Sequence, residues 1–407
     1  MNWLKISWKN IWYKPLSSIL SILLLAFGAG IISLLLNVSE QLEKQFTKNI
    51  AGIDMVIGAK GSPLQLLLSS VYQIDAPTGN IDLKEYKKLL KNPLVKTGIP
   101  LAFGDNFEGY RMVGTESSYL DLYNGEIKEG QLWSQSGEAV IGARVQELTE
   151  LELHKSFSSS HGFNAEMGDN HDHFKYQVVG VLKPTGTVLD KLILTNIESV
   201  WDVHKHEEHE EHEEHEGHEG HDHKEKPKEI TAAFIKFKSP MGIMSIPRYV
   251  NQKTSMQAAL PAIEINRLFS LMGTGISTLK SLAFLIVLIS GISVFISLYQ
   301  SLKERKFELA LLRTMGATRF QLFSLVILEG LVISIIGFLA GMAFSKIAMK
   351  IISGMAEEIY QYNLQTTFFS KEEGLLFLGI LALGFVASIL PSVQAFRLNI
   401  SKTLGDA

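Results

Sequence analysis

The chain has 407 residues and a formal net charge of −4, and 46% of its residues are hydrophobic. This length allows more than one domain, and a mean hydropathy of +0.15 is modest for a membrane protein, so a large polar part must accompany any membrane part. Cysteine is absent, which excludes disulfides and lipid attachment through a thiol and restricts a metal site to His and carboxylate ligands. No nucleic-acid partner is expected.

Four apolar stretches are long enough, at roughly 20 residues, to cross a bilayer as helices. They occupy residues 16–38, 279–302, 322–345 and 373–396. The first has an apolar part too long for a cleaved signal peptide and no clean small-residue cleavage site after it, so we expect it to remain as an anchor. Residues 1–15 before it carry Trp and Lys on opposite faces of a helix, which is typical of an interfacial amphipathic helix.

Basic residues mark one side of the membrane, because Lys and Arg concentrate in cytoplasmic loops. The segment before the first span, the short loop 303–321 and the tail 397–407 are basic, whereas the loop between the third and fourth spans carries four glutamates: Glu357, Glu358, Glu372 and Glu373. Both termini are therefore expected in the cytoplasm of a bacterial cell, with the chain crossing the inner (plasma) membrane several times.

Residues 39–278 have globular composition and should form an α+β extracytoplasmic domain inserted between helices 1 and 2, with stalk helices at both ends. Alternating apolar residues predict strands, and 3.6-residue periodicity predicts helices over 83–91 and 144–153. The Ser-, Gly- and His-rich residues 154–176 are expected to form a loop. The predicted strands cover 54–57, 111–114, 139–142, 177–182, 191–195 and 231–237.

An insert at residues 204–226 contains ten carboxylates, three lysines and no apolar side chain, so it cannot build a core. It also holds eight of the 12 histidines of the chain, mostly three residues apart. Imidazole binds Zn²⁺ and other divalent metals, and this spacing offers many interchangeable ligand sets rather than one tetrahedron. The candidate ligands are His204, His206, His209, His212, His215, His218, His221 and His223. The alternative is a solvated acidic loop without a metal role.

The loop between the second and third spans has a distinctive sequence, ERKFELALLRTMGATR, at residues 304–319. Its apolar residues predict a short helix, and Gly316 is suited to end that helix. Together with LVILEGLVISIIGFLAGMAFS in the third span and PSVQAFRLNISKTL at the C-terminus, this loop resembles the MacB/FtsX/LolC permeases. Asn399 and Ile400 stand where that family commonly has Asp-Pro.

The resemblance implies a non-catalytic permease subunit that works as a dimer of like or unlike permease subunits on separate ABC ATPase subunits. It also implies that the 303–321 loop contacts the ATPase, with Glu308 facing basic residues of that partner. The chain has no Gly-x4-Gly-Lys-Ser/Thr motif, and neither catalytic residues nor a catalytic cofactor are expected. The coupling residues that the resemblance implies are Glu304, Arg305, Glu308, Leu312, Arg313, Gly316 and Ala317.

Three residues of the third span concern helix packing. Gly337 and Gly341 form the G-x-x-x-G spacing that lets two helices approach closely, either within the chain or across a dimer. Glu329 lies two turns into the span, where an ionisable group is costly unless it is paired. We expect it to have a partner on a neighbouring helix; a proton or substrate role is the alternative.

The predicted function is export or extraction of a lipophilic, lipoprotein or peptide substrate, driven by ATP hydrolysis in a separate subunit. Two alternatives remain open. One is metal-linked transport that uses the histidine insert, and the other is FtsX-like signalling to a periplasmic hydrolase as partner. The sequence contains no polar transmembrane pathway that would favour ion conduction.

Overall fold

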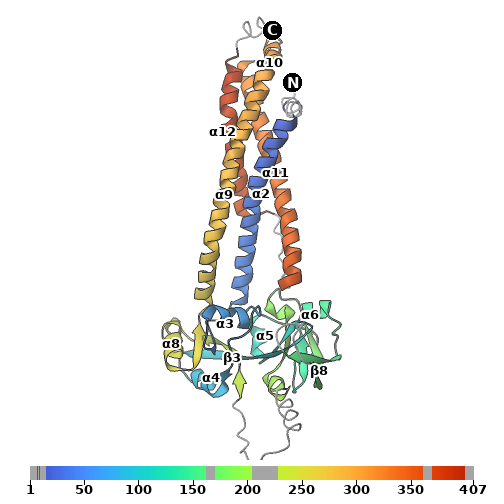
Figure 1. The fold of residues 1–407 in the computed structure, drawn as a ribbon, viewed down its shortest axis with the longest axis vertical. Helices are drawn as coiled ribbons and strands as arrows, with labels where there is room; N and C mark the ends of the chain where they lie inside the picture. The colour runs from blue at the N-terminus through green and yellow to red at the C-terminus, as the bar shows by residue number, and fades with distance from the viewer. Residues whose placement is uncertain are drawn as a thin grey trace, which may run out of the picture. The chain divides into compact units, whose positions relative to one another are not determined.

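The structure is a computed structural model that describes residues 7, 9, 15–161, 170–203, 228–360 and 369–398. Most of the predicted interfacial helix 1–15, the whole insert 204–226 and most of the tail 397–407 lie outside the described residues. The chain divides into two compact units: residues 1–43 with 270–407, and residues 44–269. The first unit is helical and the second, the inserted domain, contains the strands (Figure 1).

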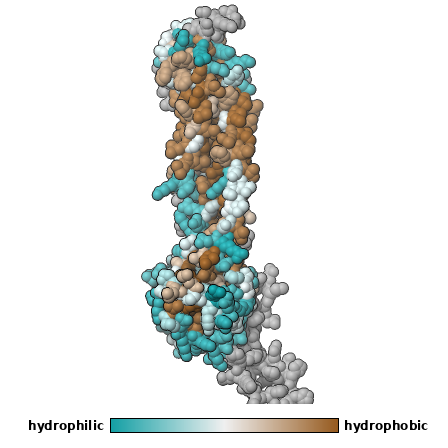
Figure 2. All heavy atoms as spheres, turned by 90° about the vertical axis from the view of Figure 1, so that its left-hand side faces the viewer, coloured by the Kyte–Doolittle hydropathy of each residue, from teal (hydrophilic) through white to brown (hydrophobic). Residues whose placement is uncertain are grey.

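Four described helices are long and apolar enough to cross a membrane: α2 (Pro15–Asn49), α9 (Pro261–Glu304), α11 (Arg319–Tyr360) and α12 (Lys371–Phe396). Figure 2 shows apolar side chains covering much of the visible surface of these helices, as lipid contact would require. Three of the helices, α2, α9 and α11, are longer than a bilayer needs, at 35, 44 and 42 residues. α2 extends beyond residue 38 to Asn49, and α9 begins at Pro261, so both include the segments that the sequence predicts as stalks.

Small residues bring the long helices into close contact. A side chain at Gly341 would meet the carbonyl oxygen of Ala26 at 2.7 Å, and one at Gly337 would meet Leu25 at 2.7 Å. Both glycines therefore face α2, and the G-x-x-x-G spacing serves packing within the chain. Between α11 and α12, Gly330 meets Ser388 in the same way, at 2.8 Å.

A mixed sheet forms the centre of the inserted domain. Its order is β12-β1-β11-β3-β4-β9-β6-β8-β5, with β7 paired to β3 and β8, and β10 pairs with β2 separately. β4–β9 and β6–β8 are parallel, and the other pairs are antiparallel. The strands are β1 (Met55–Ala59), β2 (Ile81–Asp82), β3 (Val95–Phe107), β4 (Tyr110–Thr115), β5 (Ile127–Gly130), β6 (Glu138–Ile141), β7 (Ser156–His161), β8 (Asn170–Leu182), β9 (Ile193–Asn196), β10 (Glu229–Ile230), β11 (Ala232–Phe237) and β12 (Met256–Ala259).

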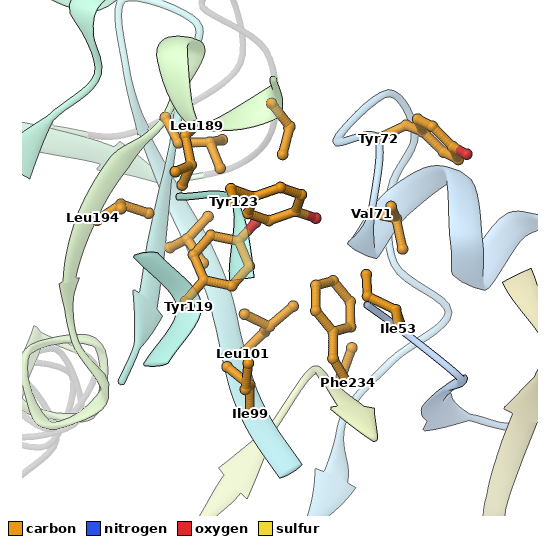
Figure 3. Close-up of a cluster of buried hydrophobic side chains, with 14 of the residues drawn as sticks. Ile53, Val71, Tyr72, Ile99, Leu101, Tyr119, Tyr123, Leu189, Leu194 and Phe234 are labelled. Carbon is orange, nitrogen blue, oxygen red and sulfur yellow. The ribbon is translucent and has the colours of Figure 1, made fainter. Parts of the chain in front are cut away.

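Short helices cover this sheet because each buries apolar residues against it. α3 (Pro63–Ser70), α5 (Ser118–Leu122) and the 3-10 turn η1 (Val188–Lys191) supply the largest cluster, while α4 (Leu83–Leu90) and α8 (Pro240–Lys253) supply a second, and α6 (Ala143–Leu148) a third. Within the largest cluster, the ring of Tyr119 lies 5.3 Å from that of Tyr123 and 5.9 Å from that of Phe234 (Figure 3).

Two local predictions were wrong. Residues 154–176 are not all loop, because β7 and the start of β8 form an antiparallel pair in which Phe157 lies opposite Tyr176. Their rings stack at 5.6 Å and are buried, so cross-strand packing outweighs the low strand propensity of the serines between them. The helix predicted over 144–153 ends at Leu148, where the chain turns extended and Leu151 enters the third cluster.

Candidate coupling site

The loop between the second and third spans folds into the short helix α10 (Lys306–Thr314). Leu309 and Ala310 are buried, and Leu309 packs against the neighbouring ends of α9, α11 and α12. The cluster around Leu309 also contains Leu302, Leu322, Leu325, Val326 and Ala395, with Leu312 packed against it. The apolar pattern of the loop therefore has a structural role on one face of α10, and Leu312 belongs to that face.

Hydrogen bonds define both ends of α10. Gly316 has φ +103°, a conformation that favours glycine, and its N–H donates to the carbonyl oxygen of Arg313 at 3.1 Å. The N–H of Ala317 donates to Leu312 O at 3.0 Å. Thr318 and Gln321 then exchange side-chain and backbone hydrogen bonds at the start of α11. Gly316 and Ala317 thus set the turn between α10 and α11, and their part in ATPase coupling stays a prediction.

Charged residues of the loop have partners within the chain. Arg305, 6% exposed, precedes α10; its Nε donates to Glu308 Oε2 at 3.3 Å and its Nη1 to Glu329 Oε1 at 3.2 Å. Arg313 Nη1 donates to the carbonyl oxygen of Leu398 at 3.0 Å, beyond the end of α12. These side chains connect α10 to α11 and to the segment after α12. Glu304 is exposed.

The outward face of α10 is apolar. Phe307 and Leu311 are each 49% exposed and Met315 is 79% exposed, at positions i, i+4 and i+8, so they lie along one side of the helix. Phe320, at the start of α11, is 69% exposed. We call these four residues the outer stripe. The outer stripe is absent from the site residues predicted from sequence, although three of its members are spaced by four. Only burial distinguishes it from Leu309 and Ala310.

No group of three or more metal-ligating side chains occurs among the residues that the structure describes. The eight candidate histidine ligands of the insert lie outside those residues.

Residues 18–233 match the MacB-like periplasmic core domain and residues 280–400 match the FtsX-like permease C-terminal family. The chain belongs to the MacB/FtsX-like permease family. Members of this family are ABC-transporter permeases, so the chain is a permease of that class, and the family setting is a membrane with an associated ABC ATPase. No curated protein matches the chain.

Two solved structures match part of the chain. The periplasmic region of MacB from Actinobacillus actinomycetemcomitans is 13% identical, with a TM-score of 0.33, and the match covers 55% of this chain and 97% of that one. The extracellular domain of the noncanonic ABC-type transporter YknZ from Gram-positive bacteria is also 13% identical, with a TM-score of 0.31, and the match covers 50% of this chain and 98% of that one.

Proposed function

We propose that this permease transmits ATP hydrolysis, carried out by a separate ATPase subunit, from α10 to the inserted domain, and that this movement exports or extracts a lipophilic, lipoprotein or peptide substrate. The observation that carries the proposal is the continuity of α2 and α9, each of which runs unbroken from an apolar span into the inserted domain. A continuous helix passes displacement along its length, because its backbone is hydrogen-bonded throughout.

The end of α2 is held by hydrogen bonds inside the inserted domain. The hydroxyl of Tyr72 donates to Phe46 O at 3.0 Å, and the hydroxyl of Tyr123 donates to Asn49 O at 3.1 Å. Asn49 Oδ1 accepts the backbone N–H of Val188 at 3.1 Å. These contacts attach backbone and side-chain groups at the end of α2 to the inserted domain, so the end of α2 cannot move without moving the core around Tyr123.

The start of α9 enters the same core. Ile265 is buried in the largest apolar cluster, and the ring of Phe269 lies 5.8 Å from that of Phe46 on α2. The two helices therefore meet within the inserted domain and share one packed joint. This geometry supports transmission by movement of the two helices.

At the other end of the proposed route, the outer stripe offers the ATPase an apolar contact next to the basic residues Lys303, Lys306 and Arg319, which are exposed. An apolar centre with a charged rim is the usual composition of a protein interface. In this proposal the basic ends face the cytoplasm, the inserted domain lies outside the inner membrane, and a second permease subunit completes the complex.

The test is recovery of the complex from native membranes with a tagged chain. Met315→Ser combined with Phe307→Ser should reduce co-purification of a Walker-motif ATPase at least tenfold, because it removes apolar contact area from the stripe. Met244→Ser is the matched control, since Met244 is 83% exposed but lies on α8 of the inserted domain. Equal ATPase recovery from both variants would reject the coupling role of the stripe. A hydrolase, in place of a lipid, lipoprotein or peptide, in the wild-type complex would favour signalling over transport.

A further inference from the structure

A carboxylate is fully buried where α12 begins. Glu373 is 0% exposed and forms a capping box with Ser370: the N–H of Ser370 donates to Glu373 Oε2 at 2.9 Å, and the N–H of Glu373 donates to Ser370 Oγ at 3.2 Å. The positive end of the helix dipole also favours a carboxylate at this position. One carboxylate oxygen is thus used by α12 itself.

The other oxygen faces two neighbouring helices. Ser33 Oγ and Asn37 Nδ2, both on α2, donate to Glu373 Oε1 at 2.7 Å and 2.8 Å. Lys346 Nζ, on α11, lies 3.3 Å from the same oxygen. Ser33 also lies 3.0 Å from Ser345 of α11. A single carboxylate therefore joins three helices, α2, α11 and α12. Its most distant partner in sequence, Ser33, is 340 residues away.

Moving α2 away from Glu373 would cost free energy. A buried carboxylate is tolerated only while its hydrogen-bond donors and counter-charge are present. If α2 moved away from α12, Glu373 would lose two of its donors, whereas those from α11 and from its own helix would remain. The penalty opposes separation of α2 from the bundle at this level.

We propose that Glu373 is a positioning residue that fixes α2 to α11 and α12, so that movement of these helices is passed to α2. The inference rests on the proposed function, because α2 matters here as the helix that continues into the inserted domain. Beyond the proposed function, the inference identifies Glu373 as the residue that holds α2 against α11 and α12. No chemical step is involved; Glu373 acts through the position of α2.

The chain contains no cysteine, so two introduced cysteines can carry spin labels without background. Glu43→Cys on α2 and Leu378→Cys on α12 use exposed positions, and electron–electron resonance on the complex purified in lipid nanodiscs measures the distance between them. Without nucleotide, the parent pair should give one narrow distance. Glu373→Ala should broaden or shift this distance distribution. Asn37→Leu should have a smaller effect on the distribution, because the carboxylate keeps three of its four donors.

Two further variants separate positioning from general stability. Glu373→Gln keeps a side-chain oxygen that can accept hydrogen bonds from Ser33 and Asn37, so this variant should show the same narrow distance as the parent pair. Glu372→Ala, at the exposed neighbouring residue, should leave the distance unchanged. Parent-like distances in both Glu373→Ala and Asn37→Leu would overturn the inference, as would a Gln variant as broad as the Ala variant.

The same samples distinguish this inference from the proposed function. The distance without nucleotide does not depend on ATP hydrolysis, so a parent complex that shows the narrow distance but recruits no ATPase would reject the proposed function and retain the role of Glu373 in holding α2. A second label pair, Asp121→Cys in the inserted domain and Leu378→Cys on α12, both at exposed positions, reports on the inserted domain relative to the spans. With the ATPase bound, ATP should change the distance distribution of this second pair in the parent complex. The complex that carries Glu373→Ala should still hydrolyse ATP, but its ATP-dependent change in distance should be at least twofold smaller than in the parent complex. An undiminished change in distance would overturn the inference.

Discussion

Arg305 Nη1 donates to Glu329 Oε1 at 3.2 Å, and the two side chains are only 7% and 6% exposed. The pair joins the residue before α10 to the third span, so the candidate coupling helix and α11 are connected by a buried ion pair. This gives Glu329 the neighbouring partner that its position in an apolar helix requires. The ion pair supports a role for Glu329 in connecting the helices.

Removing one member of this pair should be more damaging than removing both. Glu329→Leu leaves the Arg305 charge buried beside Glu308 alone, and breaking a buried pair in this way costs about 3–5 kcal/mol. Arg305→Met combined with Glu329→Leu should recover most of that loss, because two apolar groups of similar size replace the pair. Thermal unfolding in detergent measures both variants. A double variant as unstable as the single one would contradict the expectation.

Glu308→Lys should uncouple the ATPase while leaving the permease inserted. Glu308 is 55% exposed at its side chain and accepts from Arg305, so lysine places like charge beside that arginine and, in the proposed complex, beside a basic partner surface. We expect ATP hydrolysis by the assembled complex to lose its response to substrate. Glu372→Lys makes the same charge change on an exposed residue of α12 and serves as the control. An assembled Glu308→Lys complex with an unchanged response would refute the assignment.

The proposed topology can be checked with single cysteines in the cysteine-free chain. Asp121→Cys and Glu210→Cys should react with a membrane-impermeant maleimide in intact spheroplasts, because the inserted domain is proposed to lie outside. Thr314 is an exposed residue at the end of α10. Thr314→Cys and Gly405→Cys should react only after the membrane is permeabilised. Labelling of Asp121→Cys restricted to permeabilised cells would overturn the architecture.

Stability of the inserted domain should depend on the protonation of Lys191. Burial, with Arg111 and Arg144 nearby, lowers the pKa of Lys191 from 10.5 to about 7. Between these values the unfolded chain holds more protons than the folded chain, so this residue makes stability rise with pH from about 7 to 10.5. Below pH 7 the cost of the buried charge is present in full.

Lys191→Met should therefore raise the unfolding temperature of the inserted domain at pH 6–7, because it removes the free-energy cost of the buried charge, about 1.4 kcal/mol per pKa unit. It should also flatten the rise of stability with pH above pH 7. Lys253→Met, at an exposed lysine, should change neither. The measurement is thermal unfolding of the full chain at pH 6, 8 and 9.5. Parallel curves for Lys191→Met and wild type would show that Lys191 is not the group responsible.

The histidine insert makes a separate prediction. A peptide covering residues 200–228 should bind several Zn²⁺ ions weakly, because its ligand sets are degenerate, and binding should fall as pH drops through about 6.5, since protonated imidazole cannot ligate. Deleting residues 204–226 should leave the fold intact, because loop length contributes little to stability. Titration calorimetry tests metal binding by the peptide, and thermal unfolding tests the fold of the deletion variant. Activity of the deletion variant in zinc-poor and zinc-rich medium tests the metal role. Equal activity under both conditions would remove the metal alternative.

Much of the helical unit is readable from local sequence. Long apolar runs predict the four spans because burial in lipid requires each helix to satisfy its own backbone, and the basic loop around Arg305 is recognisable by its charges alone. Gly316 is identifiable as a helix end because its positive φ is a local property of glycine. The resemblance to the permease family, rather than charge alone, named Arg305, Glu308 and Arg313 as coupling residues, and it did not identify the atoms they contact.

The tertiary structure decided what depends on distant residues. Ser33 and Asn37 look like minor polar interruptions of a span until Glu373, 340 and 336 residues away, is placed beside them. Phe157 and Tyr176 lie in a serine- and histidine-rich stretch whose strands exist because their rings pack across the ladder. Phe307 and Leu309 are equally apolar in sequence, and only packing against α11 and α12 buries one and exposes the other. Hydrophobic pattern determines which segments must be buried, but side-chain contacts between segments determine which face is buried and which polar groups are paired.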